Sequence, residues 1–421
     1  MRPTTTFTRG IGRSPMGEQY DVAIVGAGVI GCALARALSL RMPGERIVVL
    51  EKEARPGQHA SGRNSGVIHS GFHLRPGGLR ARLCVSGARR LKAYCRERGV
   101  PLREGGTLVV ATEERGLMVL KELERRARAN GVAVAFVEGR ELKGLEPHVR
   151  GLAGLYAPED AVLQPEAYVG ALFEDSRAHG VRYLFGARLL SVKEHEGLLL
   201  ETTRGPLRAR LLVNCAGAHA LHVARLAGLN PPYAVMPFRG EYYLLSKPYS
   251  FLVRSAIYPA PDLSYPFLGI HLTKRTDGQV LVGPNAVPSL GLEAYEWRAV
   301  RPGEAARLLK AQEVARLAWR PRNLSLLARE LLSSLSRTLF CARAKRLVPS
   351  LRPEMLARGP AGIRPQLLDR HGRLMDEPVL LTSSHSVHVL NAISPALTSS
   401  LSFADYLAAL LLREGYIKAS A

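Results

Sequence analysis

The residues best suited to chemistry near the N-terminus are three glycines with the spacing G-x-G-x-x-G, namely Gly26, Gly28 and Gly31. In such a turn the first glycine permits a tight bend, and the second lets backbone N–H groups approach a pyrophosphate. The third lets the following helix pack closely against the strand. Glu51 comes 20 residues after Gly31 and can accept hydrogen bonds from an adenosine ribose. Because an acid here favours an unphosphorylated ribose, the pattern predicts a site for FAD or NAD rather than NADP.

The segments around these glycines must form a β-α-β unit to position them. Residues 20–25 are an apolar, β-branched run that predicts a buried strand, and residues 32–40 have helical spacing. A Pro-Gly pair ends that helix, and residues 46–50 predict a second, parallel strand. The stretch HASGRNSGVIHSG at 59–71 is rich in small polar residues and suits close backbone approach to a large planar cofactor, which favours FAD.

The composition is that of an ordered globular protein: 421 residues, 47% hydrophobic and 22% charged. It excludes a disordered or collagen-like chain, and the apolar runs are far shorter than the roughly 20 residues of a membrane-spanning helix. The five cysteines have neither CxxC nor zinc-finger spacing, so we expect reduced thiols in a cytoplasmic protein and no metal site. Residues 1–18 lack the apolar core of a secretory signal and are predicted to be a disordered tail.

Longer motifs resemble the D-amino-acid-oxidase-type flavoproteins and, within them, the L-2-hydroxyglutarate dehydrogenase/oxidase group. The resemblance runs from about residue 20 to the C-terminus. The segments that carry it are GRNSGVIHSGFHLRPGGLRARLC at 62–84, LLVNCAGAHA at 211–220, MPFRGEYYLL at 236–245, IYPAPDLSYPFLGIHLTKRTDGQVLVGPNA at 257–286, GPAGIRPQLLDRHG at 359–372 and VLNAISPALTSSLSFADYLA at 389–408. The sequence departs from the family at His73-Leu74, where aromatic residues are usual, and this bears on substrate identity if that segment lines the substrate pocket.

The resemblance implies an α/β fold with a Rossmann-like FAD-binding domain formed by a discontinuous chain, and a substrate domain with a mixed or antiparallel sheet. The FAD-binding domain is expected at residues 19–105, 148–232 and 350–421. The substrate domain is expected at residues 106–147 and 233–349, with a basic helical segment at 301–346. A helix that opens at 394–400 would direct its positive end at the flavin ring.

FAD is the implied cofactor, and we expect it to be bound non-covalently, because no cysteine lies where covalently flavinylated relatives attach theirs. The cofactor-binding residues that the resemblance implies are Gly26, Gly28, Val29, Ile30, Gly31, Glu51, Lys52, Ser61, Arg63, Asn64, Ser65, Gly66, Val67, Leu189, Ala216, Gly217, Gly362, Arg364, Ser394, Ala396, Leu397 and Thr398.

The activity that the resemblance implies is oxidation of a 2-hydroxy acid, with L-2-hydroxyglutarate giving 2-oxoglutarate. Such a reaction needs a hydride acceptor, a group that takes the hydroxyl proton, a cation for the carboxylate and exclusion of water. His271 and His69 are alternative candidates for the base. Arg239 and Arg364 are the candidate carboxylate ligands, since an arginine fork can hold a carboxylate with two hydrogen bonds, and Tyr258 is a candidate hydroxyl donor.

Two other functions remain open at this point. An amine oxidase of glycine or sarcosine oxidase type would share the FAD domain, but it gives no reason for the motifs around Arg239 and His271. A flavin-containing nucleic-acid-binding protein has only the formal charge of +22 in its favour, because the sequence holds no recognised nucleic-acid-binding motif. We therefore expect no nucleic-acid partner.

Residues 301–346 carry 11 basic and 3 acidic side chains on a helical pattern of leucine and alanine. They could form solvated helices that cover the substrate domain. Alternatively, they could form a basic amphipathic surface that rests on the inner face of the cell membrane, against anionic lipid, where a quinone could reach the flavin. The sequence leaves the electron acceptor open between a quinone and O2.

Overall fold

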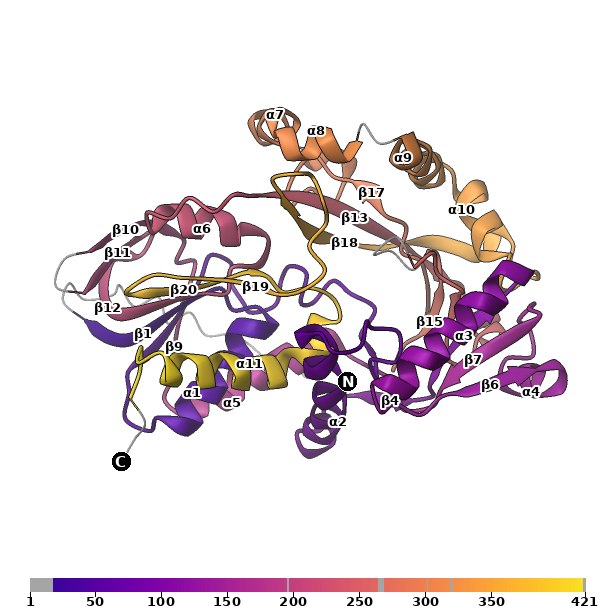
Figure 1. The fold of residues 1–421 in the computed structure, drawn as a ribbon, viewed down its shortest axis with the longest axis horizontal. Helices are drawn as coiled ribbons and strands as arrows, with labels where there is room; N and C mark the ends of the chain where they lie inside the picture. Colours follow the sequence, from indigo (N-terminus) through magenta and orange to yellow (C-terminus); the bar gives the residue numbers. More distant parts are fainter. Residues whose placement is uncertain (1–17, 195–196, 264–268, 301, 319–320, 419–421) are drawn as a thin grey trace.

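Two β-sheets and their covering helices form the framework of the computed structural model (Figure 1). The structure describes residues 18–194, 197–263, 269–300, 302–318 and 321–418. Nearly all of the predicted N-terminal tail therefore lies outside the described residues, as do parts of the basic segment. In the part of the chain that is described, no helix is both long and apolar enough to cross a membrane.

The first sheet contains the glycine motif. Its strand order is β10 (Leu189–Glu194), β11 (Leu198–Thr202), β12 (Gly205–Asn214), β1 (Gln19–Val25), β2 (Ile47–Glu51) and β9 (Arg182–Phe185), with β20 (Ser386–Asn391) beside β12 and β19 (Val379–Thr382) beside β20. Strands β9, β2, β1, β12 and β20 are mutually parallel. Residues 22–25 of β1 are buried and apolar on both faces, as is usual in a parallel sheet.

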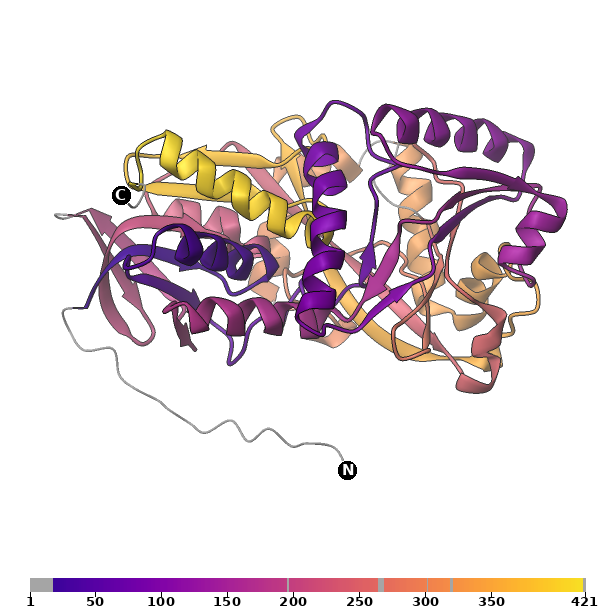
Figure 2. The ribbon, with the colours of Figure 1, turned by 90° about the horizontal axis from the view of Figure 1, so that it is seen from below.

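Helices cover one face of this sheet. They are α1 (Val29–Arg41), α5 (Pro165–Ala178) and α11 (Ala396–Arg413), and they pack in one core with Val22 and Ile24 of β1. On the other face, β1 forms a core with side chains of β10, β11 and α6 (Ala220–Leu226), which follows η1 (Gly217–His219). Helix α2 (Leu79–Glu97) contacts α11 and runs between the two halves of the molecule (Figure 2).

The second sheet is mixed and mainly antiparallel. Its order is β17 (Val287–Pro288), β13 (Tyr233–Leu245), β16 (Val280–Val282), β15 (Leu272–Lys274), β14 (Ala256–Pro259), β5 (Thr107–Ala111), β7 (Ala153–Ala157) and β6 (Ala135–Glu138), with β18 (Leu356–Asp369) along β13. Helix α3 (Glu114–Ala129) packs on β5 and β7, and α4 (Gly139–Leu145) lies next to β6. Strands β13 and β18 reach from this sheet to the first one, so they can position residues between the two.

A third, smaller sheet joins distant segments in the order β3 (Val67–Ile68), β8 (Ala161–Leu163) and β4 (Leu102–Glu104). Strands β3 and β8 are antiparallel, and Ile68 pairs with Ala161. The register therefore brings the residue after β3 next to the residue before β8.

The basic segment forms short helices along one outer edge of the molecule, near β13, β17 and β18 (Figure 1). They are α7 (Pro302–Lys310), α8 (Gln312–Ala318), α9 (Pro321–Leu335) and α10 (Arg337–Ala344). Three short 3-10 helices, η2 (Lys247–Leu252), η3 (Trp297–Ala299) and η4 (Pro353–Met355), occur in the connections.

These observations confirm the α/β prediction of a parallel sheet with helical cover and a second, mixed sheet. The strand pairing differs from the predicted division at two places. Strand β7 pairs with β5 and β6, and β18 pairs with β13, so both belong to the second sheet. The sequence-based division had placed both strands in the FAD-binding domain, because pairing between segments so far apart cannot be read from local pattern.

Candidate functional site

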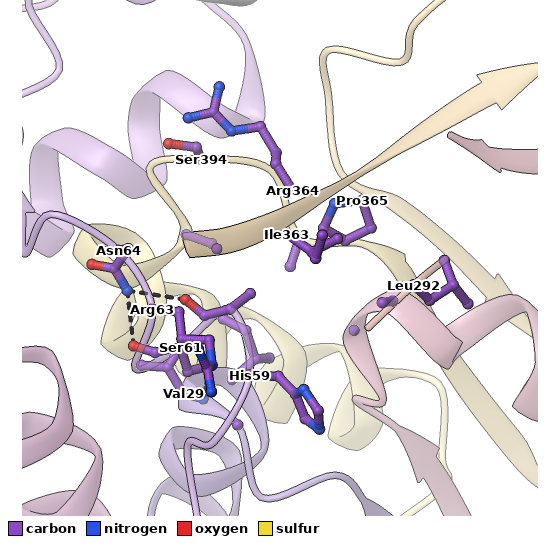
Figure 3. Close-up of a pocket in the computed structure, with 18 of the residues that line it drawn as sticks. Val29, His59, Ser61, Arg63, Asn64, Leu292, Ile363, Arg364, Pro365 and Ser394 are labelled. Atoms are coloured by element: carbon purple, nitrogen blue, oxygen red, sulfur yellow. Dashed lines mark hydrogen bonds between the residues drawn. The ribbon is translucent and has the colours of Figure 1, made fainter. Parts of the chain in front are cut away.

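A cavity of about 410 Å³ is lined by residues from both large sheets (Figure 3). The segments that line it come from the β1–α1 turn, the end of β2, the loop at 57–69, the turn after β12, strands β13 and β18, and the stretch that leads into α11. The turns after β1, β2 and β12 are at the carboxyl ends of parallel strands, where ligands bind in open α/β sheets.

The glycine motif forms one end of the cavity. Gly26, Gly28, Val29 and Ile30 line it, whereas Gly31 does not. A Cβ atom on Gly31 would lie 1.9 Å from the carbonyl oxygen of Gly26, so this position requires glycine for the turn to pack on α1. The N–H of Val29 donates to Ser61 Oγ at 2.9 Å, and the start of α1 faces the cavity. A helix N-terminus so placed favours an anionic group.

Glu51, at the end of β2, is buried and lines the cavity. Its two carboxylate oxygens accept the backbone N–H groups of Ala27 and Glu53, at 2.8 and 2.9 Å. The acid thus fixes the glycine turn, and its remaining lone pairs could accept hydrogen bonds from a ribose. Lys52 also lines the cavity, where its ammonium pairs with Glu53 and, at 2.6 Å, with Glu293.

The polar loop after β2 folds by side chain–backbone hydrogen bonds. Asn64 Nδ2 donates to the carbonyl oxygens of Ala60 and Ser61 (dashed lines in Figure 3), and Arg63 Nε donates to the carbonyl of Gln58. In this loop Ser61, Arg63, Asn64, Ser65 and Val67 line the cavity, whereas Gly66 does not. A Cβ on Gly362 would lie 2.2 Å from the Arg63 carbonyl oxygen, which explains the glycine where β18 crosses this loop.

Helix α11 begins beside the cavity at Ala396, two residues later than the sequence predicted. Ser394, Ala396 and Leu397 line the cavity, together with Leu189, Ala216 and Gly217 from the first sheet. No side chain caps this helix, so its first N–H groups are available to a ligand. Thr398 lies behind the lining, where its Oγ1 accepts the backbone N–H of His69 at 3.2 Å.

Two histidines and a tyrosine meet at the other end. The rings of Tyr258 and His271 stack with centroids 4.1 Å apart, and the His69 ring lies edge-on to Tyr258 at 6.0 Å. All three residues line the cavity. His271 Nδ1 donates to the carbonyl oxygen of Gly269 at 2.9 Å, which leaves Nε2 as the acceptor. Burial lowers the pKa of His271 to about 3 and raises the pKa of Tyr258, so both rings are neutral at pH 7.

The two candidate arginines lie on opposite faces of one strand pair. Phe238 and Arg364 are directly opposite each other in β13 and β18, and both line the cavity. Arg239 is the next residue along β13 and does not line it. Its guanidinium pairs with Glu241 at 3.0 Å and stacks on Trp297 at 4.1 Å. Alternation along β13, where Phe238 and Gly240 line the cavity, places Arg239 in an ion pair on the other face.

The comparisons with known proteins agree with this geometry. Residues 21–410 match the family model described as DAO, FAD dependent oxidoreductase. The chain belongs to this family of FAD-dependent oxidoreductases. Its relatives include the L-2-hydroxyglutarate dehydrogenase of Escherichia coli O17:K52:H18, 34% identical over 384 residues, which cover 91% of this chain and 90% of the relative. The human mitochondrial L-2-hydroxyglutarate dehydrogenase is 33% identical, with 95% and 90% covered.

Solved structures with the same fold include the L-α-glycerophosphate oxidase of Mycoplasma pneumoniae with FAD bound. It has a TM-score of 0.73 and 24% identity, with 94% of this chain and 95% of that chain covered. Glycine oxidase from Geobacillus kaustophilus has a TM-score of 0.71 and 21% identity, with 94% and 95% covered. These likenesses concern the fold alone.

The cavity of this DAO-family oxidoreductase fits FAD by its own features. The Gly31 and Gly362 contacts keep backbone close to the lining, Glu51 stands at the end of β2, and two helices start at the cavity wall. The backbone N–H groups of α1 could hold a pyrophosphate, and those of α11 could face the flavin. Of the predicted cofactor residues, all line the cavity except Gly31, Gly66 and Thr398.

Sequence reasoning missed several residues of the site. Tyr242 lines the cavity and could have been found by alternation, since it lies two and four residues after Gly240 and Phe238 on the same face of β13. Asp160 contacts His69 from behind, and no local motif signals it. The segment 292–295 also lines the cavity, and Glu293 in it forms ion pairs with Lys52 and His219. His73 does not line the cavity, although its ring contacts His69.

Proposed function

We propose that this protein oxidises L-2-hydroxyglutarate to 2-oxoglutarate. The observation that carries the proposal is the joint placement of one half-buried arginine, two histidines and a tyrosine in a cavity that fits FAD. The relatives that cover nine-tenths of the chain bear the name of this activity. FAD, when bound, supplies the acceptor for the hydride that leaves the substrate α-carbon.

Arg364 is the proposed carboxylate ligand. It is buried enough that desolvation lowers its pKa, yet a guanidinium stays protonated at neutral pH. Tyr242 and Tyr258, which act on Arg364, are phenols whose pKa values burial raises, so both are neutral at pH 7. An incoming carboxylate could accept charge-assisted hydrogen bonds from this guanidinium.

His69 is the proposed base, and His271 the proposed neutral hydrogen-bond partner. A base works best when its conjugate acid has a pKa near the working pH. The pKa of His271, lowered by burial to about 3, makes this ring a weak base, and the positive charge of Arg364 further disfavours a second positive charge there. His69, by contrast, lies 3.5 Å from the carboxylate of Asp160.

We propose that FAD is bound without a covalent bond. Cys215 is the cysteine that lines the cavity, and burial raises the pKa of its thiol to about 12. The nucleophilic thiolate is therefore scarce at neutral pH. Acid precipitation tests this: all flavin should appear in the supernatant, and flavin retained in the precipitate would contradict it.

The test of the main proposal is anaerobic mixing with candidate substrates while the flavin absorbance near ~450 nm is followed. We expect rapid bleaching with L-2-hydroxyglutarate, and none with its D-isomer, glycine or sarcosine. Bleaching by the amino acids alone would instead establish an amine oxidase. Reoxidation of the reduced protein by a soluble quinone and by O2, compared at equal concentration, identifies the acceptor class.

We propose further that the basic helices touch an anionic membrane, as a cytoplasmic protein could on its inner face. Leu309 of α7, Leu331, Leu332 and Leu335 of α9 and Leu339 of α10 expose between 36% and 70% of their surface. Exposed Arg329 and Arg337 flank these leucines. A surface that is both apolar and basic has the chemistry of an interfacial helix.

Vesicle flotation tests this surface. We expect the protein to float with vesicles that contain anionic phosphatidylglycerol at low salt, and to dissociate as salt increases. A Leu332→Asp, Leu335→Asp double variant should lose binding. Met118→Asp, at a 69% exposed residue of α3, is the matched control and should keep it. No flotation of the parent protein at low salt would overturn the proposal.

A further inference from the structure

Two buried polar atoms face each other behind the cavity. His69 Nδ1 and Asp160 Oδ2 are 3.5 Å apart, and neither makes a hydrogen bond in the described structure. The Asp160 side chain has no exposed surface, and that of His69 is 13% exposed. Leaving a buried carboxylate oxygen without a donor is costly, and the nearby His69 Nδ1 is placed to become that donor.

The fold fixes Asp160 from several sides. The β3–β8 register places Asp160 opposite His69, since Ile68 pairs with Ala161. Asp160 Oδ1 accepts the backbone N–H of Ser70 at 2.6 Å, and its carbonyl oxygen accepts the N–H of Gly106 at 3.1 Å. The second carboxylate oxygen is thereby directed at the His69 ring.

His69 is held just as firmly by its backbone. Its N–H donates to Thr398 Oγ1 at the start of α11, and its carbonyl accepts the thiol of Cys84 on α2 at 3.2 Å. The ring can therefore turn about its side-chain bonds without displacing the chain. A small rotation would bring Nδ1 within normal hydrogen-bond distance of Asp160.

The charges favour an ionised Asp160. Burial alone would raise its pKa, but the nearby His69 ring and the hydrogen bond from the Ser70 N–H hold the pKa below its ordinary value. Three titratable side chains that feel its charge stay neutral at pH 7. Burial raises the pKa values of Cys84 and Tyr258, and it lowers that of His73 to about 3.

We propose that Asp160 is a positioning residue that makes His69 the base of the reaction. By accepting Nδ1–H it selects the tautomer whose Nε2 lone pair can face the cavity. When the substrate O–H bond breaks, its proton goes to Nε2, and the carboxylate of Asp160 stabilises the positive ring. The inference rests on the proposed 2-hydroxy-acid oxidation, because it assigns the proton of that hydroxyl group.

Asp160→Asn tests the proposal with little change in volume. The Asn oxygen can still accept from Ser70, whereas its NH2 group would face His69 Nδ1 and select the other tautomer. We expect the limiting rate of flavin reduction by L-2-hydroxyglutarate to fall about 100-fold or more, with little change in the substrate concentration at half-saturation and unchanged FAD content.

A double-variant comparison separates positioning from structure. If Asp160 acts through His69, the His69→Gln, Asp160→Asn variant should be no slower than His69→Gln alone. The inference would be overturned if the two substitutions lowered the rate of flavin reduction independently, so that their effects multiplied in the double variant. It would also be overturned if the Asp160→Asn variant reduced its flavin as fast as the parent protein. Asp175→Asn is the matched control. It removes another buried carboxylate, paired with Arg36 at 2.6 Å away from the cavity, and should lower stability but not the reduction rate.

The parent protein distinguishes a failure of this inference from a failure of the proposed function. If no 2-hydroxy acid bleaches the parent flavin, the proposed function fails, and the role given to Asp160 fails with it. If L-2-hydroxyglutarate bleaches the parent and the Asn variant equally fast, only the role of Asp160 is wrong.

Discussion

The two ends of the cavity differ in the groups that line them, which are mainly backbone groups at one end and side chains at the other. The motif end, formed by residues 26–30 with Glu51 and Ser61, presents mainly backbone N–H groups. The histidine end, formed by His69, Tyr258, His271 and Arg364, presents side chains from four separate segments. Backbone groups can hold a constant ligand without depending on side-chain identity. Side chains from separate segments can be exchanged one at a time, so the second end can set substrate and reaction while the first stays fixed.

The largest expected effect separates Arg364, at the histidine end, from Arg239, on the other face of the same strand pair. Arg364→Met should lower kcat/KM for L-2-hydroxyglutarate by about 1000-fold, because a charged hydrogen bond in a desolvated site is lost. Arg239→Met, one register position away on the opposite face, should destabilise the protein on the order of 3 kcal/mol by breaking its pair with Glu241. Steady-state kinetics and urea unfolding measure both. A loss of kcat/KM in folded Arg239→Met equal to that in Arg364→Met would contradict the assignment.

At the motif end, we expect substitutions to change the affinity for FAD. Gly31→Ala places a methyl group 1.9 Å from the Gly26 carbonyl oxygen, so the turn must move and FAD binding should weaken by about 100-fold. Gly170→Ala in α5 is the control, because its added Cβ meets nothing within 4 Å and an alanine favours the helix. Fluorescence titration of the apoprotein with FAD gives both affinities. Equal affinity in the two variants would show that the turn does not need its glycine.

At the histidine end, we expect the pH dependence of the free energy of unfolding to depend on His271. The pKa of His271 is about 3 in the folded protein against an ordinary 6.5. Between these two pH values the His271 ring is protonated in the unfolded chain and neutral in the folded protein. The contribution of the neutral His271 ring to the free energy of unfolding is fully present above pH 6.5 and is lost as the pH falls from there toward 3. His271→Phe should reduce the slope of unfolding free energy against pH by up to about 1.4 kcal/mol per pH unit in that window.

Urea unfolding at several pH values between 4 and 7 measures that slope. His385→Asn, at an exposed histidine outside the cavity, serves as the control and should leave the slope of the parent protein nearly unchanged. A His271→Phe slope equal to that of the parent would mean that the ring is charged in the folded state.

The smallest expected effect concerns one hydrogen bond at the motif end. Ser61→Ala removes the acceptor for the Val29 N–H, a contribution of about 1 kcal/mol, so FAD affinity should fall about fivefold. Ser86→Ala removes a serine hydroxyl that bonds Arg82 and Ser402 outside the cavity, and FAD affinity should not change. Titration with FAD checks both variants, and an unchanged affinity in Ser61→Ala would mean that the hydroxyl does not order the start of α1.

Much of the motif end could be predicted because its determinants are close in sequence. A strand, a glycine turn, a helix and an acid after the next strand are all local patterns, and each was found at the expected position. At the histidine end, His69, His271, Tyr258 and Arg364 were named by resemblance to a family. Arg239 was named for the same reason, and the structure places it outside the cavity lining.

The sequence by itself determined the family, the glycine turn and the dinucleotide end of the cavity, because these depend on glycine spacing and on apolar periodicity within one β-α-β unit. The tertiary structure decided which arginine faces the cavity, which histidine has a carboxylate behind it, and to which sheet β7 and β18 belong. The physical reason is register. A shift of one residue along β13 turns a side chain to the other face, and the pairing of β3 with β8 joins residues 69 and 160, which no local pattern connects.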